Sequence, residues 1–246
     1  MKKYVYVLPL CLLLFSGCES TQQILKDLGQ TGTGTGTSTG STTGGLSTND
    51  IIAGLKEALA LGAERSSSKL SAMDGFFKDA AVKILLPQEA QKVEKTLRDL
   101  GMGSLVDKAI LSVNRAAEDA AKSAAPIFVN AVKSMTINDA LGILKGSDTA
   151  ATSYLKGKTT VALTNAFKPV IEKSLAKVNA TKYWGDLFST YNKFATNKVN
   201  TDLSAFVTER ALSGIFYQVG QEEKAIRKDP VARTTDILKK VFGKNS

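Results

Sequence analysis

Two groups of charged residues have the residue types that catalysis by carboxylates requires, although their spacing in the sequence fixes no distance between carboxylates on separate helices. Arg115 and Glu118 are three positions apart, and Glu223 and Arg227 are four positions apart, so each pair would share one helix face. Paired carboxylates can act as general acid and base, with arginines orienting an anionic substrate. We favour a structural interpretation, because such pairs commonly join the helices of a bundle. The candidate polar cluster comprises Asn114, Arg115, Glu118, Glu222, Glu223, Arg227, Asp229, Arg233 and Asp236.

A smaller polar group and the aromatic residues are further candidates for binding. The polar group consists of Asp148, Thr149, Thr152 and Tyr154. Aromatic side chains at helical spacing could line an apolar pocket for lipid, but we expect most of them in the core. Tyr183 and Trp184 could instead form a partly exposed interaction site. The aromatic residues expected in the core are Phe76, Phe77, Phe128, Tyr154, Phe167, Tyr183, Trp184, Phe188, Tyr191, Phe206, Phe216 and Tyr217.

Cys18 offers a different chemistry, because a diacylglycerol can alkylate its thiol. Two lysines precede an apolar run over residues 4–15. This run is shorter than the roughly 20 apolar residues of a spanning helix and is typical of a secretory signal. Residues 15–18 are Phe-Ser-Gly-Cys and resemble the lipobox of bacterial lipoproteins, in which leucine is usual in place of Phe15. We therefore predict a signal peptide over residues 1–17 and a lipid on Cys18.

The predicted anchor determines where we expect the protein to act. In the sorting rule that accompanies the lipoprotein resemblance, aspartate after the cysteine retains a protein at the inner membrane. Glu19 follows Cys18 here, so we expect the outer membrane and its periplasmic face, with surface exposure as the alternative. Loss of Lys2 and Lys3 with the signal lowers the net charge from +9 to +7. We expect the membrane as a partner, together with an envelope protein, cell-wall material or lipid, and no nucleic acid.

Missing residue types exclude several classes of enzyme. The chain has no histidine, and its two cysteines are Cys11 in the predicted signal and Cys18. The mature chain therefore has no Ser-His-Asp triad, histidine base, thiol nucleophile, disulfide or ordinary zinc or copper site. Carboxylate, lysine and tyrosine chemistry remain open, as does oxygen-ligated calcium or magnesium. We predict no catalytic activity, no metal site and no cofactor.

The composition changes sharply along the chain and indicates its domains. Residues 18–46 form a predicted linker, in which residues 31–45 are almost entirely threonine, glycine and serine and have little to bury. Residues 47–246 show successive helical patterns, while alternating strand patterns are nearly absent. We predict an all-α, multi-helix bundle that forms a single domain on a flexible, lipidated tether.

Caps, glycines and prolines predict the helix boundaries. Ser47-x-x-Asp50, Ser104-x-x-Asp107 and Thr136-x-x-Asp139 have the pattern of capping boxes. Asp74-Gly75 predicts a turn, and residues 80–86 could form a helix or a strand. In the first half of the domain we predict a helix from Pro87 to about Leu100 closed by Gly101, a break at Pro126 and a helix end at Gly146. In the second half we predict a helix over 148–178 interrupted at Pro169, helices over 182–193 and 202–228, and a last helix from Asp229-Pro230 to about Phe242.

Short stretches spread over nearly the whole predicted domain carry a family resemblance. They are Met73–Phe76, Val82–Ile84, Leu86-Pro87, Leu97-Arg98, Gly101, Asn114–Glu118, Ile127-Phe128, Met135–Ile137, Asp139-Ala140, then Asp148, Ala150–Thr152 and Tyr154 within the run from Gly146 to Tyr154, and Asp202-Leu203, Val207-Thr208, Ala211-Leu212, Glu222–Lys224, Ile226-Arg227, Asp229-Pro230, Arg233–Asp236 and Val241-Phe242. From about Gly54 to Gly243 the sequence resembles the bacterial family called domain of unknown function 4197, with Ile215 where we expect leucine. The resemblance implies exported, helical proteins, often lipoproteins, and no established activity.

Three functions remain compatible with the sequence. The leading hypothesis is a non-catalytic envelope protein that binds or supports a partner. The first alternative is a carboxylate-based hydrolase of envelope glycan or ester, which requires exposed glutamates in a concave site. The second is a carrier of a hydrophobic ligand such as lipid, which requires an enclosed apolar cavity of roughly 300 Å³ or more.

Overall fold

The computed structural model describes residues 47–181, 184, 192–193, 198, 202–228 and 235. The predicted signal peptide, Cys18 and the linker lie outside the described residues, as do most of the helix predicted over 182–193 and nearly all of the last predicted helix. Residues 44–246 belong to one compact unit. Its described part contains helices and no strand, which confirms the predicted all-α domain.

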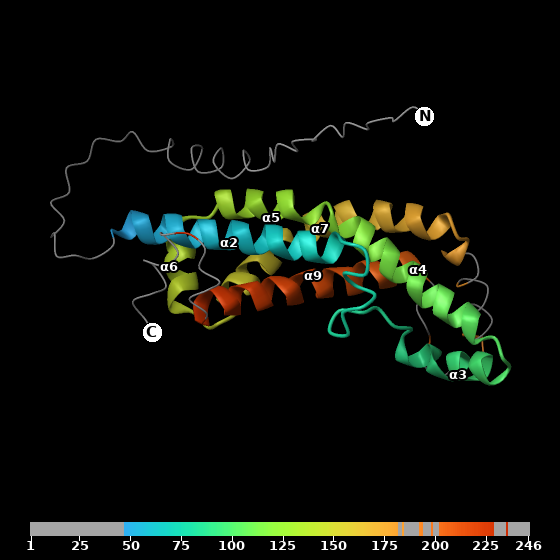
Figure 1. Cartoon of the computed structure of the whole chain (residues 1–246). Coiled ribbons are helices and arrows are strands. Elements are labelled where there is room, and N and C mark those ends of the chain that lie inside the picture. Colours follow the sequence, from blue (N-terminus) through green and yellow to red (C-terminus); the bar gives the residue numbers. More distant parts are fainter. Residues whose placement is uncertain are drawn as a thin grey trace, which may run out of the picture. The chain divides into compact units, whose positions relative to one another are not determined.

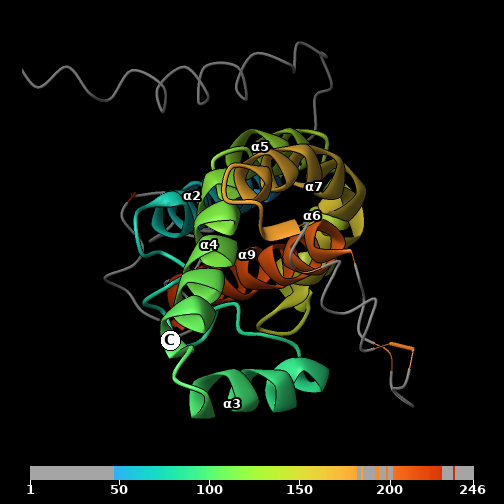
Figure 2. The ribbon, with the colours of Figure 1, turned by 90° about the vertical axis from the view of Figure 1, so that its right-hand side faces the viewer.

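The helices run in the order α2 (Thr48–Ser71), the 3-10 helix η1 (Gln88–Ala90), α3 (Gln91–Asp99), α4 (Gly103–Ala121), α5 (Ala124–Lys133), α6 (Ile137–Lys145), α7 (Ala150–Ala176) and α9 (Leu203–Lys228). Helix α2 packs against α5 and α9, and α7 packs against α4, α5, α6 and α9 (Figure 1). Helix α3 stands apart from the other helices and packs mainly on α4 (Figure 2).

The buried residues of α7 explain how one helix contacts so many others. They recur at every fourth position: Ala151, Leu155, Thr159, Leu163, Phe167, Ile171 and Leu175. A step of four residues in an α-helix advances the side chain by about 40° beyond a full turn. The buried stripe therefore winds around α7, so that successive turns of the helix face different neighbours.

Two of the three predicted capping boxes are confirmed. The side chains of Ser47 and Thr136 each accept a hydrogen bond from a main-chain N–H three residues later, at the starts of α2 and α6. The prediction for Ser104 is wrong, because α4 already begins at Gly103 and has no side-chain cap. The carboxylate of Asp107 instead accepts a hydrogen bond of 2.8 Å from Arg98 and ties α4 to α3.

The prolines interrupt the helices less than the sequence suggests. Pro87 is the N-cap of η1 rather than its first residue. Pro126 lies in the first turn of α5, where a main-chain N–H has no partner within the helix, and the break falls before it, after Ala121. The predicted interruption at Pro169 is wrong, because α7 continues through it. The cost is one missing hydrogen bond, and close packing of the neighbouring turns can offset it.

The long connection between α2 and η1 is neither of the two elements expected for residues 80–86. The Asp74-Gly75 turn is confirmed, with Asp74 in the left-handed region at φ 69°. Turns extend to Val82, and residues 83–87 then run without turn, bend, helix or strand. Gly101 closes α3 as predicted, at φ 77°, where a residue without Cβ is favoured. Helix α6 stops at Gly146 as predicted.

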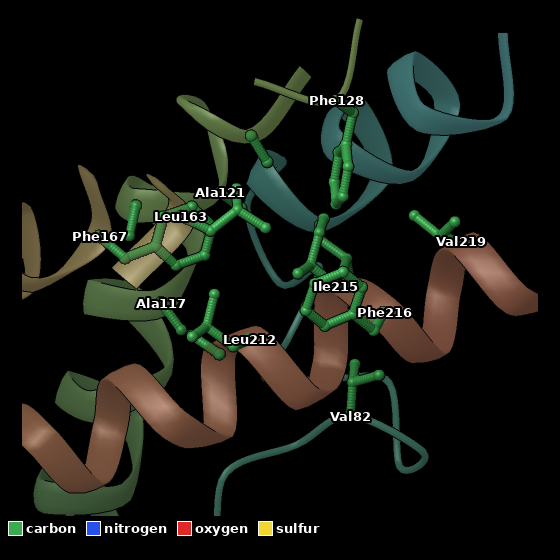
Figure 3. Packing of buried hydrophobic residues seen from close by; sticks show 14 of the residues in the cluster. Val82, Ala117, Ala121, Phe128, Leu163, Phe167, Leu212, Ile215, Phe216 and Val219 are labelled. Carbon is green, nitrogen blue, oxygen red and sulfur yellow. The ribbon is translucent and has the colours of Figure 1, made fainter. Parts of the chain in front are cut away.

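A hydrophobic core joins the helices and this connection. The rings of Phe128 and Phe216 meet edge to face, with centroids 5.8 Å apart. Figure 3 shows Val82 directed from the connection toward α9, close to Phe216. Helix α4 contributes small residues such as Ala117 and Ala121, both fully buried, which allow close helix packing. Within the part of the chain that the structure describes, no helix has the length and apolarity of a membrane span.

Substitution of Gly214 by alanine should destabilise the domain. A Cβ at this position of α9 would lie 2.6 Å from Cε1 of Phe76, whose side chain is fully buried. We expect Gly214→Ala to lower the free energy of unfolding by about 1–3 kcal/mol, because the ring must move within a packed core. Urea unfolding followed by circular dichroism measures this change.

Gly157→Ala in α7 is the matched control, since nothing lies within 4 Å of its added Cβ. This variant should gain up to about 1 kcal/mol from helix propensity. Equal stability of the two alanine variants would contradict the packing described here.

Candidate functional site

The first predicted charged pair holds the turn after α2 against α4. One carboxylate oxygen of Glu118 accepts hydrogen bonds from the main-chain N–H groups of Phe76 and Phe77, at 3.1 and 3.2 Å. The other oxygen lies 2.6 Å from Arg115, which also contacts Asp74 at 2.6 Å. Both oxygens of this buried carboxylate are therefore engaged within the protein.

Asn114 holds the next part of the same connection. Its side-chain oxygen accepts a hydrogen bond from the N–H of Ile84, and its amide donates to the carbonyl of Ile84, both at 2.8 Å. The amide also donates to the carbonyl of Ile110 within α4. Asn114 is fully buried, so these bonds replace the hydration that its amide loses on folding. The side-chain amide of Asn114 thus binds both main-chain groups of Ile84, as a residue of a neighbouring strand would.

The second predicted charged pair joins α9 to the corner between α6 and α7. Glu223 accepts hydrogen bonds from the N–H groups of Ala151 and Thr152 at 3.0 and 2.8 Å, and from the Thr152 hydroxyl at 2.7 Å. Arg227 donates to Glu223 and to the carbonyl of Ile143 in the last turn of α6. The carboxylate thus meets a helix N-terminus and the guanidinium meets a helix C-terminus, as the helix dipoles favour.

The smaller polar group predicted near residue 150 partly belongs to the same corner. Thr152 binds Glu223, and Asp148 forms an ion pair of 2.6 Å with Lys228. Tyr154 is half-buried, and Lys158 lies over its ring at 5.7 Å. Glu222 points elsewhere and lies 3.9 Å from Arg65 of α2. Asp229, Arg233 and Asp236 lie outside the described residues.

The surroundings of these groups shift several of their pKa values. Hydrogen bonds from Lys78 and Arg115 hold the pKa of Asp74 below its ordinary value of 3.8. Hydrogen bonds to Glu118 and Asp74 raise the pKa of Arg115. Lys228 lowers the pKa of Asp148, and burial raises that of Tyr154. The pKa shifts of Asp74, Arg115 and Asp148 therefore all favour the charged form of the side chain. This suits ion pairing rather than proton transfer near neutral pH.

The arrangement does not bring the predicted acid and base together. Glu118 binds the turn at Phe76, whereas Glu223 binds the start of α7, and both are buried with their oxygens occupied. The cavity beside Glu223 has a volume of about 20 Å³, which is room for a water molecule and not for a substrate. Among the described residues, no three acidic side chains gather in a way that could hold a metal ion.

A larger depression lies on the surface, between the connection before η1 and helix α9. We call it the basic groove. Its volume is about 400 Å³, within the range of ligand sites. Among the described residues that line it, Lys83 and Arg210 are the two charged ones and none is a carboxylate. The groove is lined by Ala81, Val82, Lys83, Ile84, Leu85, Leu86, Pro87, Gln88, Phe206, Arg210, Ser213, Gly214 and Tyr217.

Sequence patterns alone did not predict the basic groove. The prediction that Tyr217 is a core residue is wrong, because 44% of it is exposed at the groove. The idea of an exposed Trp184 is also wrong, since it is buried and stacks on Phe206 with centroids 5.9 Å apart. A partial signal was available in the sequence: Arg65 and Arg210 have no acidic residue three or four positions away, whereas Arg98, Arg115 and Arg227 do. Of these two, Arg65 lies 3.9 Å from the distant Glu222.

Residues 45–243 match the model of a protein family described as "Protein of unknown function (DUF4197)". The chain belongs to this family. The resemblance identified from short stretches between Gly54 and Gly243 is thereby confirmed. The match spans every described helix. It therefore includes the charged pairs at Glu118 and at Glu223 and the basic groove of this DUF4197 protein. No curated protein and no solved structure matches the chain.

Glu223→Gln should destabilise the DUF4197 domain strongly. The amide that replaces the carboxylate offers one acceptor in place of two and removes the negative charge that Glu223 places against Arg227, of which 14% of the side chain is exposed. We expect a loss of about 3 kcal/mol in the free energy of unfolding. Denaturant titration of the purified protein measures the loss.

Glu222→Gln is the matched control, one position away on α9. Its carboxylate is partly exposed and lies 3.9 Å from Arg65, so we expect a loss of less than about 1 kcal/mol. Equal effects of the two substitutions would refute the structural role assigned to Glu223.

Proposed function

We propose that this protein is a lipid-anchored, non-catalytic binding protein of the bacterial cell envelope, which holds its partner in the basic groove. The signal-like N-terminus, the Phe-Ser-Gly-Cys sequence before residue 19 and the threonine- and glycine-rich linker support the anchor. We place the anchor in the outer membrane with the domain facing the periplasm, because Glu19 rather than aspartate follows Cys18. The membrane is then one partner, and nucleic acid is not expected there.

The observation that carries the binding role is the different use of charge in the interior and in the groove. The buried carboxylates of Glu118 and Glu223 accept hydrogen bonds from main-chain N–H groups and from arginines, so they serve the fold. In contrast, Arg210 and Lys83 are cations in an open depression, and no carboxylate is found among the described residues of its lining. An open surface with available charge suits association with a partner.

The same features favour binding over the two alternatives. A carboxylate hydrolase requires accessible acids, whereas 5% of the Glu118 side chain and 4% of the Glu223 side chain are exposed. A carrier requires an enclosed apolar cavity, whereas the cavity between α2, α7 and α9 is about 20 Å³ and the basic groove is open.

Cys18→Ser should release the protein from the membrane. Without the thiol no diacylglycerol can be attached, and the chain would lose its acyl chains. We expect wild-type protein in the membrane fraction of cells and the variant in the soluble fraction or unprocessed, and mass spectrometry of the mature wild type should detect a lipidated N-terminal cysteine.

The control is Cys11→Ser, which removes the other cysteine from within the predicted signal. It should leave fractionation unchanged. An unmodified thiol at residue 18 of the mature wild-type protein would refute the anchor.

A photo-crosslinking residue placed at Leu85 should capture a partner in living cells. Leu85 lines the basic groove and is 57% exposed, so benzoylphenylalanine there can reach an occupant without disturbing the core. We expect a discrete, reproducible crosslinked species after irradiation, seen by immunoblotting and identified by mass spectrometry.

The same residue at Val161, which is 74% exposed on α7 away from the groove, should give no such species. The binding role in the groove fails if the two positions give the same pattern, or if neither gives a product.

A further inference from the structure

The two cations of the basic groove lie over aromatic rings, and neither forms an ion pair with a carboxylate of the described residues. The Arg210 guanidinium lies 5.4 Å from the centre of the Phe206 ring, and the Lys83 ammonium lies 4.3 Å from that of Phe77. Among the described arginines, Arg210 is the one without a carboxylate within 4 Å in the described part of the chain. Stacking of this kind orients a guanidinium and leaves its N–H donors available. The basic groove can therefore bind an anionic group through these donors.

The main chain along one wall of the groove is also available. Asn114 satisfies the N–H and the carbonyl of Ile84 from the α4 side. In an extended chain the main-chain groups of successive residues point to opposite sides, so Asn114, which binds both main-chain groups of Ile84, does not use those of Leu85. Within the described residues they have no hydrogen-bond partner. Leu86 precedes a proline, which favours the extended conformation that such pairing needs.

From these two features, and resting on the proposed binding function, we infer that the basic groove binds a short extended segment of a partner protein that carries a carboxylate. The segment adds alongside residues 83–86 and exchanges hydrogen bonds with Leu85, as a strand adds to the edge of a sheet. Its carboxylate meets Arg210, whose planar fork can donate two parallel hydrogen bonds to one carboxylate. Lys83 supplies a second positive charge in the lining of the same groove.

A peptide fits this surface better than an anionic lipid does. A phosphate headgroup would engage Arg210 and Lys83, but its acyl chains could not use the main-chain donor and acceptor of Leu85. Leu85 and Tyr217 are exposed at the rim, where they can pack on alternate side chains of an added strand. The combination of fixed cations, apolar surface and unpaired main chain is met in full by an acidic, extended peptide.

Selection from displayed random heptapeptides tests this inference. The full-length protein, extracted from membranes in detergent, serves as bait, and Arg210→Gln serves as counter-selection. We expect enriched peptides that contain an aspartate or glutamate among β-branched or aromatic residues. Arg210→Gln should weaken binding of a selected peptide by about tenfold or more, Arg210→Lys by less, and methylation of a single main-chain nitrogen of the peptide should also weaken it.

Lys173→Gln is the charge-matched control, because Lys173 is exposed on α7 and does not line the groove. It should leave peptide affinity unchanged, and circular dichroism should show all variants folded. The inference is overturned if no peptides are enriched over the counter-selection, if enriched peptides lack acids, or if main-chain methylation has no effect. Binding of phosphatidylglycerol vesicles that is lost in Arg210→Gln, without peptide binding, would assign the groove to lipid and also overturn it.

The crosslinking experiment at Leu85 separates this failure from failure of the proposed function. A protein crosslinked at Leu85 through a segment without acids leaves the binding role in place and removes the inferred peptide chemistry. Absence of any crosslinked species from Leu85 removes the binding role as well.

Discussion

The buried carboxylate of Glu223 is the constraint on which the arrangement of α6, α7 and α9 depends. A charge removed from water must be compensated in full, and here the compensation comes from two N–H groups and a hydroxyl at the start of α7 and from Arg227. Arg227 in turn binds the last turn of α6. Three helices can therefore meet only in the orientation that places all these groups around one carboxylate.

The need to compensate buried polar groups also determines the conformation of the irregular connection that forms one wall of the basic groove. A connection of some fifteen residues between α2 and η1 carries main-chain groups that no helix satisfies. Glu118 and Asn114 of α4 bind three of its N–H groups and one carbonyl, while Phe76, Val82 and Ile84 enter the core. The connection is thus fixed from the inside, and the side that faces away from α4 is left to line the groove.

The sequence predicted what local rules control and missed what tertiary contacts control. Ser47, Thr136, Asp74-Gly75 and Gly101 mark boundaries correctly, because caps and left-handed turns depend on a few neighbouring residues. The uninterrupted α7 at Pro169 and the early start of α4 depend on packing against other helices, which no local pattern contains. The sequence predicted that the two residues of each charged pair share one helix face. It could not predict the groups that these pairs bind, because those groups lie 41 to 84 positions away in the sequence.

The arginines of the chain likewise differ in whether they have a local or a distant carboxylate partner, and this difference distinguishes the basic groove. Arg98, Arg115 and Arg227 have acidic partners at helical spacing, and their charges are used within the fold. Arg210 has neither a local nor a distant carboxylate in the described structure, and its guanidinium rests on Phe206. An exposed cation on a ring contributes little to stability compared with a buried ion pair. Arg210 and Leu85 line the same groove, and the proposed association with a partner would give this exposed cation a role that the fold does not require. This separates the groove from the structural clusters.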